Sequence, residues 1–333
     1  MDKNKIHLIT GGAGFIGSHL VDQLLTAGYK IRVLDNFSVG RKENLAHHAS
    51  NSNLEIIAGD VNDFDIVSSA MRDVDTVFHL AARADIVPSI EMPEVYYQAN
   101  VNGTFNVMQA ARKEDVRKVI YASSSSCYGM TNEIPTTETA PTQPQYPYAL
   151  TKYLGEQILF HWGQVYDIPT LAICIFNAYG PRARTKGTYG AVFGVFLAQI
   201  AANKPVTIVG DGEQKRDFIY VTDVANAFVM GAQSDIDHKR LNIGSGHPQS
   251  INHLVKLLKA KEIVHIPKRP GEPDITFANT TEVERDLNWK AKVPFKEGVD
   301  NMLADIAHYK DAPVWTESSI ETATKSWFKH LSE

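Results

Sequence analysis

The chain has 333 residues, of which 21% are charged and 9% aromatic, and a net charge of −5. This length can form one large α/β domain or two domains, and the charge gives no reason to expect nucleic acid or an anionic membrane as a partner. No apolar run reaches the ~18–20 residues that cross a bilayer. We expect no signal peptide, because the first predicted strand begins at residue 6.

The two cysteines, Cys127 and Cys174, both stand in apolar contexts. We therefore expect buried thiols rather than a disulfide, as is typical of a reducing, cytoplasmic environment. No Cys/His cluster has metal-ligand spacing, so no metal is expected. Most of the twelve histidines are interpreted as surface or packing residues.

A glycine-rich turn follows the first strand. Glycines stand at Gly11, Gly14 and Gly17, and helical periodicity follows them. A second apolar strand, 31–34, ends at Asp35, where an acid would bond the ribose hydroxyls of adenosine. This spacing predicts a dinucleotide-binding unit, with the phosphates at the helix N-terminus. NAD is favoured over NADP, because Asp35 would repel a 2′-phosphate and no Arg or Lys directly follows it.

Apolar strand-like segments alternate with amphipathic helices through the first half. The expected strands are 6–10, 31–34, 55–59, 76–80, 117–123 and 170–176, and the expected helices are 14–27, 63–72, 93–112 and 148–166. Strands that are apolar on both faces and separated by helices predict an α/β fold with a Rossmann-type, doubly wound parallel sheet. Ligands of such sheets bind outside the carboxyl ends of the strands, where Asp60, Ser123 and Asn177 stand.

The pattern changes after Asn177. The expected elements are a loop at 181–190, a helix at 192–202, short strands at 206–209 and 218–221, and helices at 222–231, 251–259, 281–288 and 297–309. We interpret these as a smaller, interleaved α/β domain of residues 177–213 plus 241–333, beside a cofactor domain of residues 1–176 plus about 214–240. An apolar stripe from Ile320 to Leu331 predicts a helix that packs on its own domain, with partner binding as the alternative.

Tyr148 and Lys152 are four residues apart near the start of a predicted helix, which places them on one face, one turn apart. Near a nicotinamide, the lysine ammonium would lower the pKa of the phenol by about two units and make it a base toward a substrate hydroxyl. Ser123 and Ser124, at the end of a strand, could hydrogen-bond the same substrate oxygen.

Several motifs extend these patterns over nearly the whole chain. They are residues 10–17 (TGGAGFIG), 34–36 (LDN), 59–61 (GDV), 79–82 (HLAA), 100–104 (NVNGT), 123–129 (SSSSCYG), 148–152 (YALTK), 176–182 (FNAYGPR), 216–217 (RD) and 269–272 (RPGE). In these motifs the chain resembles the extended short-chain dehydrogenase/reductase family of nucleotide-sugar epimerases and dehydratases.

The resemblance implies two ligand sites. The implied NAD-binding residues are Gly11, Gly14, Phe15, Ile16, Gly17, Asp35, Asn36, Asp60, Val61, Leu80, Ala81, Ala82, Asn100, Tyr148 and Lys152. The implied substrate-binding residues are Ser124, Asn177, Val192, Arg216, Arg269 and Thr276, and the implied catalytic residues are Ser124, Tyr148 and Lys152. Arginines suit a diphosphate because their donors are planar and bidentate. A salt bridge with Asp217 or Asp223 is the structural alternative for Arg216.

The resemblance also implies the reaction. The 4,6-dehydratases of this family carry an Asp-Glu pair, and the decarboxylating members usually a Glu, where this chain has Ser125 and Ser126. A 4-epimerase with tightly bound NAD and a transient 4-keto sugar is therefore expected. Its expected substrates are UDP-glucose and UDP-galactose, together with the N-acetylated pair if the small Thr276 admits it. The alternatives are a UDP-glucuronate 4-epimerase, another nucleotide-sugar oxidoreductase or dehydratase, and a non-catalytic NAD-binding protein.

A homodimer is expected as well. Members of the family pair through the helices that correspond to 93–112 and 148–166. Leu154, Ile158, Leu159 and Trp162 surround more of the second helix than one sheet face can bury. A C2 dimer would cover this surplus symmetrically.

Overall fold

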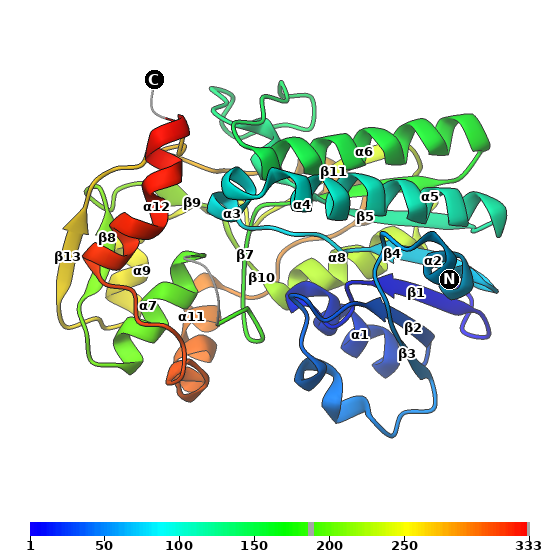
Figure 1. Cartoon of the computed structure of the whole chain (residues 1–333), viewed down its shortest axis with the longest axis horizontal. Coiled ribbons are helices and arrows are strands. Elements are labelled where there is room, and N and C mark those ends of the chain that lie inside the picture. The colour runs from blue at the N-terminus through cyan, green and yellow to red at the C-terminus, as the bar shows by residue number, and fades with distance from the viewer. Residues whose placement is uncertain (186–189, 332–333) are drawn as a thin grey trace.

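A parallel sheet runs through the larger part of the computed structural model, which describes residues 1–185 and 190–331 (Figure 1). Its strand order is β11-β6-β5-β4-β1-β2-β3. The strands are β1 (Ile6–Thr10), β2 (Lys30–Asp35), β3 (Leu54–Ala58), β4 (Val74–His79), β5 (Lys118–Ser124), β6 (Thr170–Ile175) and β11 (Lys239–Ile243). The order turns back between β1 and β4, where a doubly wound sheet binds its ligand. The predicted fold class is confirmed.

The expected strands coincide with β1 to β6, apart from one or two residues at their ends. β11 was not expected, because it begins with Lys239 and Arg240 and has only a short apolar part. It pairs in parallel with β6, with Leu241 opposite Ile173. The expected domain boundary near residue 240 falls inside this strand, and the division into two domains stays a prediction.

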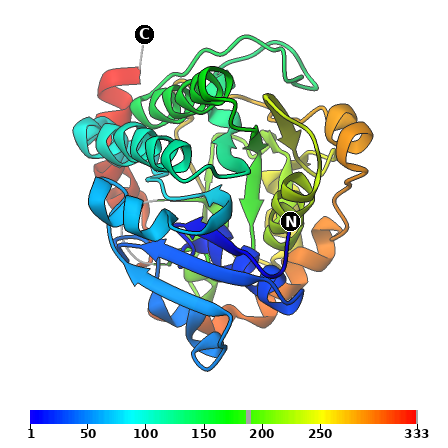
Figure 2. The same cartoon turned by 90° about the vertical axis from the view of Figure 1, so that its right-hand side faces the viewer.

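Helices cover both faces of the sheet (Figures 1 and 2). α1 (Phe15–Thr26), α8 (Val221–Gln233) and α10 (Thr281–Leu287) pack into one apolar core, and α2 (Phe64–Met71), α5 (Gly103–Lys113) and α6 (Pro147–Tyr166) pack into the other. Leu20, Leu24 and Phe228 are fully buried in the first core, and Met108 and Leu159 in the second. Leu159 therefore belongs to the sheet's own core and not to a surplus apolar surface.

The single helix expected at 93–112 is divided into three segments. α4 (Pro93–Tyr97) leads through a π-helical turn, Gln98–Asn102, into α5. Within this turn, Asn100 accepts a hydrogen bond from the Arg83 amide at 2.8 Å and donates to the Arg83 carbonyl at 3.0 Å and to Thr151 Oγ1 at 3.0 Å. These bonds tie the π-helical turn to the segment after β4, and such turns are frequent at functional sites.

A second packed region lies on the left in Figure 1. Its helices are α7 (Val192–Ala201), α9 (Ile251–Leu257), α11 (Phe295–Ala304) and α12 (Glu317–Leu331). Its strands form three pairs: β7 (Asn177–Tyr179) with β10 (Phe218–Tyr220), β8 (Val206–Val209) with β13 (Ile263–Ile266), and β9 (Lys215–Arg216) with β12 (Gln249–Ser250). Stacked rings fill its core, with centroids 4.5 Å apart for Tyr179 and Phe193 and 5.2 Å apart for Phe218 and Phe295. Within the loop expected at 181–190, residues 186–189 lie outside the described residues.

The remaining elements are short. α3 (Ile86–Glu91) was not expected, and 3₁₀ helices span Lys42–His48, Ser125–Tyr128 and Ile306–Tyr309. The last of these, with α11, replaces the single helix expected at 297–309. None of the helices in the described ranges combines the length and the apolarity of a transmembrane segment.

Candidate active site

The glycine-rich turn fits tightly between β1, α1 and the end of β4. Gly11 has a φ of +72°, and a Cβ built on it would lie 2.7 Å from the Ala81 amide nitrogen. A Cβ on Gly17 would lie 2.2 Å from the Gly11 carbonyl oxygen. Neither position can hold a side chain, because the backbones approach too closely. α1 therefore begins directly on the turn, as a pyrophosphate-binding helix does.

Asp35 ends β2 beside this turn and is 7% exposed. Its carboxylate accepts hydrogen bonds from the Ala13 amide at 3.0 Å and the Phe37 amide at 2.8 Å. Burial raises the pKa of Asp35, and these two backbone hydrogen bonds oppose the rise. The next residue, Asn36, donates to Asp60 Oδ2 at 2.6 Å. The structure thus brings the ends of β2 and β3 together beside the glycine turn.

The other residues implied for NAD lie on elements around the same edge of the sheet. Phe15 and Ile16 begin α1, and Leu80, Ala81 and Ala82 follow β4. The Ala81 amide donates to Thr10 Oγ1 at 3.3 Å. Val61 is buried beside Gly103, where a Cβ would lie 2.6 Å from its Cγ2. The close backbone approach at the glycine turn and the acid at the end of β2 suit a bound dinucleotide. The individual contacts between these residues and NAD stay predictions.

His79 is a buried residue that the sequence analysis left without a role. Its Nδ1 lies 2.7 Å from Thr10 Oγ1 and its Nε2 lies 3.0 Å from Thr104 Oγ1. Burial lowers the pKa of His79 to about 3, so the ring is neutral in the physiological range. His79 therefore links β1, β4 and α5 behind the glycine turn. Its place in the HLAA motif was visible in the sequence, but its two threonine partners were not.

Ser124, Tyr148 and Lys152 lie on two packed elements, and their catalytic roles stay predictions. Ser124 ends β5, and Tyr148 lies at the start of α6, which packs on β5. One turn further along α6, Lys152 Nζ lies 4.1 Å from the centroid of the Tyr121 ring. Burial lowers the pKa of Lys152 to about 8, although the nearby Cys127 and Glu156 act in the opposite direction.

Burial raises the pKa of Tyr148, and the hydrogen bond from Ser124 only partly offsets this rise. The expected lowering of the Tyr148 pKa by Lys152 is therefore not found in the NAD-free protein. The reason is the cost of placing a phenolate in a desolvated position.

Ser123 does not share the position of Ser124. It is 2% exposed and its hydroxyl donates to Glu156, a fully buried carboxylate on α6. Arg240, from β11, donates to the other oxygen of Glu156 through Nε at 2.8 Å. The expectation that Ser123 bonds the substrate oxygen is corrected by this geometry. This contact could not be predicted from local spacing, because Ser123, Glu156 and Arg240 are far apart along the chain.

Arg216 and Arg269 both pair with the carboxylate of Glu272. Arg216 Nη2 donates to Glu272 Oε1 at 2.8 Å, and Arg269 Nη1 lies 3.7 Å from Glu272 Oε2. The alternative partners of Arg216 are engaged elsewhere: Asp217 accepts from Ser245 and Ala278, and Asp223 accepts from the amides of Lys292 and Val293. Arg216 and Glu272 also line a hollow with Gln214, Lys268 and Asp274.

Asn177 and Thr276 are in direct contact beside these arginines. Thr276 Oγ1 donates to Asn177 Oδ1 at 2.6 Å and accepts from the Asp217 amide at 3.1 Å. The threonine hydroxyl thus has two protein partners, and any effect of Thr276 on the sugar would come from its size. Val192 is half-buried at the start of α7, against the core of the second region. The substrate roles of these residues stay predictions.

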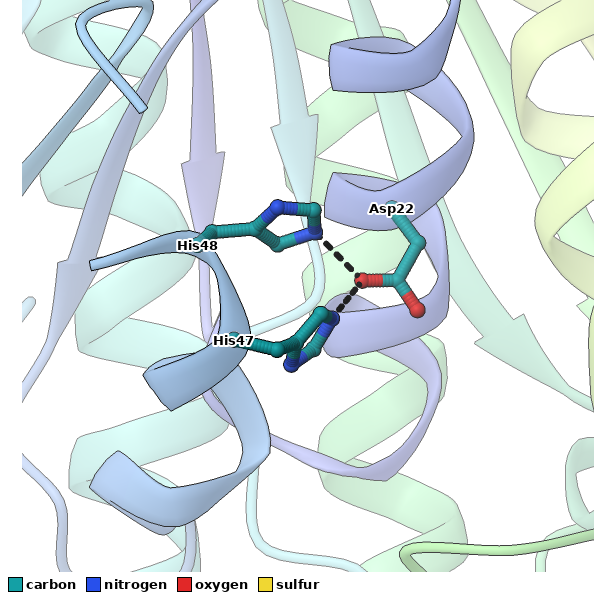
Figure 3. Close-up of side chains that lie close together, drawn as sticks. All are labelled: Asp22, His47 and His48. Atoms are coloured by element: carbon teal, nitrogen blue, oxygen red, sulfur yellow. Dashed lines mark hydrogen bonds and ion pairs between the residues drawn. The ribbon is translucent and has the colours of Figure 1, made fainter. Parts of the chain in front are cut away.

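Asp22, His47 and His48 form a cluster that the sequence spacing did not predict (Figure 3). Both imidazole Nε2 atoms lie 2.8 Å from Asp22 Oδ1, and Arg182 Nη1 lies 2.8 Å from Asp22 Oδ2. Burial would raise the pKa of Asp22, but the two histidines and Arg182 lower it overall. The three donors stabilise this carboxylate and tie the 3₁₀ helix Lys42–His48 to α1.

Comparison with known proteins gives a consistent result. A family model described as GDP-mannose 4,6 dehydratase matches residues 8–302. The UDP-glucose 4-epimerase of Mycolicibacterium smegmatis is 36% identical over 300 residues, which cover 88% of this chain and 95% of that protein.

Two solved structures resemble this chain over nearly its whole length. A UDP-N-acetylglucosamine 4-epimerase from Methanobrevibacter ruminantium, in complex with UDP-N-acetylmuramic acid, has a TM-score of 0.87 and 32% identity, and the match covers 92% of this chain and 99% of that one. A UDP-glucose 4-epimerase from Thermus thermophilus, in complex with NAD, has a TM-score of 0.81 and 30% identity, with 92% and 100% covered.

The burial of Tyr148 leads to a prediction about its ionisation. In NAD-free protein we expect Tyr148 to stay protonated up to at least about pH 10, the ordinary pKa of tyrosine, because burial raises its pKa. The near-ultraviolet absorbance of tyrosinate, followed as the pH is raised, should give the same curve for wild type and Tyr148→Phe below that pH. An additional tyrosinate in the wild type near neutral pH would contradict this account.

Proposed function

Within the extended short-chain dehydrogenase/reductase family of nucleotide-sugar epimerases and dehydratases, to which this chain belongs, we propose that it interconverts the C4 epimers of a UDP-hexose with NAD as its cofactor. The placement of Tyr148 and Lys152, one turn apart on a single face of α6 and packed against β5, carries this proposal. Ser125 and Ser126 follow at the start of a 3₁₀ helix and offer neither the acid nor the base that dehydration needs. UDP-glucose and UDP-galactose are the proposed substrates.

The site residues divide the proposed reaction among them. Tyr148 takes the proton from O4 of the sugar while the C4–H bond breaks, and Ser124 hydrogen-bonds the same oxygen. When bound, NAD supplies the acceptor for the C4 hydride and returns it. The charge of Lys152 stabilises the phenolate form of Tyr148 by Coulomb attraction.

The two arginines act on the other end of the substrate. Arg216 and Arg269 hold the diphosphate while the 4-keto sugar turns to present its other face. The hydride then returns to that face, and Tyr148 gives its proton back to O4. NAD is regenerated in each cycle and stays bound.

The direct test is a panel of nucleotide sugars incubated with the NAD-containing protein, with the configuration at C4 read by NMR. We expect UDP-glucose and UDP-galactose to interconvert. Tyr148→Phe should lower kcat by at least ~10²-fold, the usual contribution of a general base, and keep its bound NAD. Epimerisation of UDP-glucuronate alone would replace the proposed substrate. A 4-keto-6-deoxy product, or a normal rate for Tyr148→Phe, would contradict the mechanism.

We further propose that the enzyme is a homodimer and works in the cytoplasm. The face formed by α4, α5 and α6 exposes apolar side chains, namely Tyr97 (48%), Phe105 (38%), Leu150 (44%), Val165 (52%) and Tyr166 (39%). Such a contiguous face is typical of a C2 interface. The two buried, unpaired thiols, Cys127 and Cys174, fit a reducing compartment.

If the protein is a homodimer, charged substitutions on this face should halve its mass in solution. Wild type should scatter light as a dimer at micromolar concentration, and Phe105→Glu combined with Val165→Glu should give a monomer, because two charges on each subunit would be buried without partners. Ile56→Glu is the matched control, since Ile56 is 45% exposed on the edge strand β3, outside this face. A monomeric wild type would contradict the proposal.

A further inference from the structure

The C-terminal helix α12 lies beyond residue 302, where the family match ends. It is nevertheless well packed, because Ile320, Thr324 and Trp327 are at most 4% exposed. Figure 1 shows it in red beside α3, and Ser326 Oγ donates to Glu91 Oε1, at the end of α3, at 2.9 Å. The tail was expected to pack on its own domain, but its contacts reach α3, within residues 1–176, as well as the 269–272 loop. Its position matters because of what Trp327 contacts.

Trp327 packs against the RPGE loop, which carries one of the two proposed diphosphate-binding arginines. Its indole Nε1 donates to the Pro270 carbonyl at 2.7 Å. The Arg269 guanidinium lies over the indole ring, with its Cζ 5.4 Å from the centroid. The hydrogen bond holds the loop backbone, and the cation–π contact holds the arginine side chain. A single residue thus constrains both the position and the direction of Arg269.

The indole also lies near the predicted catalytic tyrosine, with one ring between them. The centroids of Trp327 and Tyr146 are 6.4 Å apart, and Tyr146 is stacked on Tyr148 with centroids 6.3 Å apart and an interplanar angle of 12°. Next to Trp327, Phe328 lines a hollow together with Met130, Arg269 and Glu272. Trp327 on α12 therefore contacts both the loop of Arg269 and the ring that stacks on Tyr148.

We propose that Trp327 is a positioning residue of the nucleotide-sugar site, which fixes Arg269 toward the diphosphate and makes α12 a wall of this site. This inference rests on the proposed function, because it assigns a diphosphate to Arg269. It adds a residue from outside the part of the chain that the family match covers. Since Trp327 acts through Arg269, its loss should weaken nucleotide binding more than it slows the chemical step.

Three variants test this assignment. Trp327→Ala removes both contacts, and Trp327→Phe keeps a ring under Arg269 but removes the donor to Pro270. Trp289→Phe is the matched control, because the indole of Trp289 is also buried and also donates to a backbone carbonyl, that of Asp223 at 3.3 Å, but lies in the core of the cofactor side. For each variant, the NAD content, the Kd of UDP by calorimetry, and KM and kcat for UDP-glucose are measured.

We expect Trp327→Ala to raise the Kd of UDP and the KM about tenfold, because an Arg269 side chain released from both contacts must be ordered when the nucleotide binds. Its kcat should change less than its KM, its NAD content should not change, and Trp327→Phe should lie between it and wild type. Trp289→Phe should leave the Kd of UDP unchanged. Equal UDP affinity of wild type and Trp327→Ala would overturn the assignment even if epimerisation is normal, whereas a wild type that binds no UDP would instead refute the proposed function.

Discussion

The catalytic helix is held against the sheet by a fully buried carboxylate. Glu156 follows Tyr148 and Lys152 at intervals of four residues, so all three lie on one face of α6. Ser123 from β5 and Arg240 from β11 both donate to Glu156. Removing Arg240 would leave the Glu156 charge buried without compensation, which is far more costly than breaking an exposed ion pair, and removing the Ser123 hydroxyl would cost one hydrogen bond to that carboxylate. The place of the catalytic tyrosine therefore depends on a strand more than seventy residues later in the chain.

At the end of the site proposed to bind the diphosphate, two arginines have the same acidic partner. Arg216 and Arg269 both approach Glu272, so two positive charges meet one negative charge. Both guanidinium groups have the planar donors that suit the proposed diphosphate, and Glu272 orients them in its absence. The catalytic end is arranged differently, since burial lowers the pKa of Lys152 and raises that of Tyr148. The two arginines are thus oriented before substrate arrives, whereas at the catalytic end burial opposes the phenolate form of Tyr148.

The sequence predicts those features that depend on local spacing. The glycine turn, the six apolar strands and the Tyr148–Lys152 pair all follow from residues that are near one another in the chain, and the structure has each of them. Contacts between distant segments could not be predicted. β11 is too polar at its start to be recognised as a strand, and its identity depends on pairing with β6. Likewise, the partner of Ser123 is set by tertiary packing, and so is the contact between Trp327 and the RPGE loop.

In the proposed reaction, C4 of the sugar loses and regains the same hydride while its diphosphate stays bound. The most direct test is to incubate the NAD-containing enzyme in ordinary water with UDP-glucose that carries deuterium at C4, and to follow the UDP-galactose by NMR. We expect deuterium to be retained at C4 of the product. Replacement of this deuterium by hydrogen from the solvent would contradict hydride return and point to a proton-abstraction route instead.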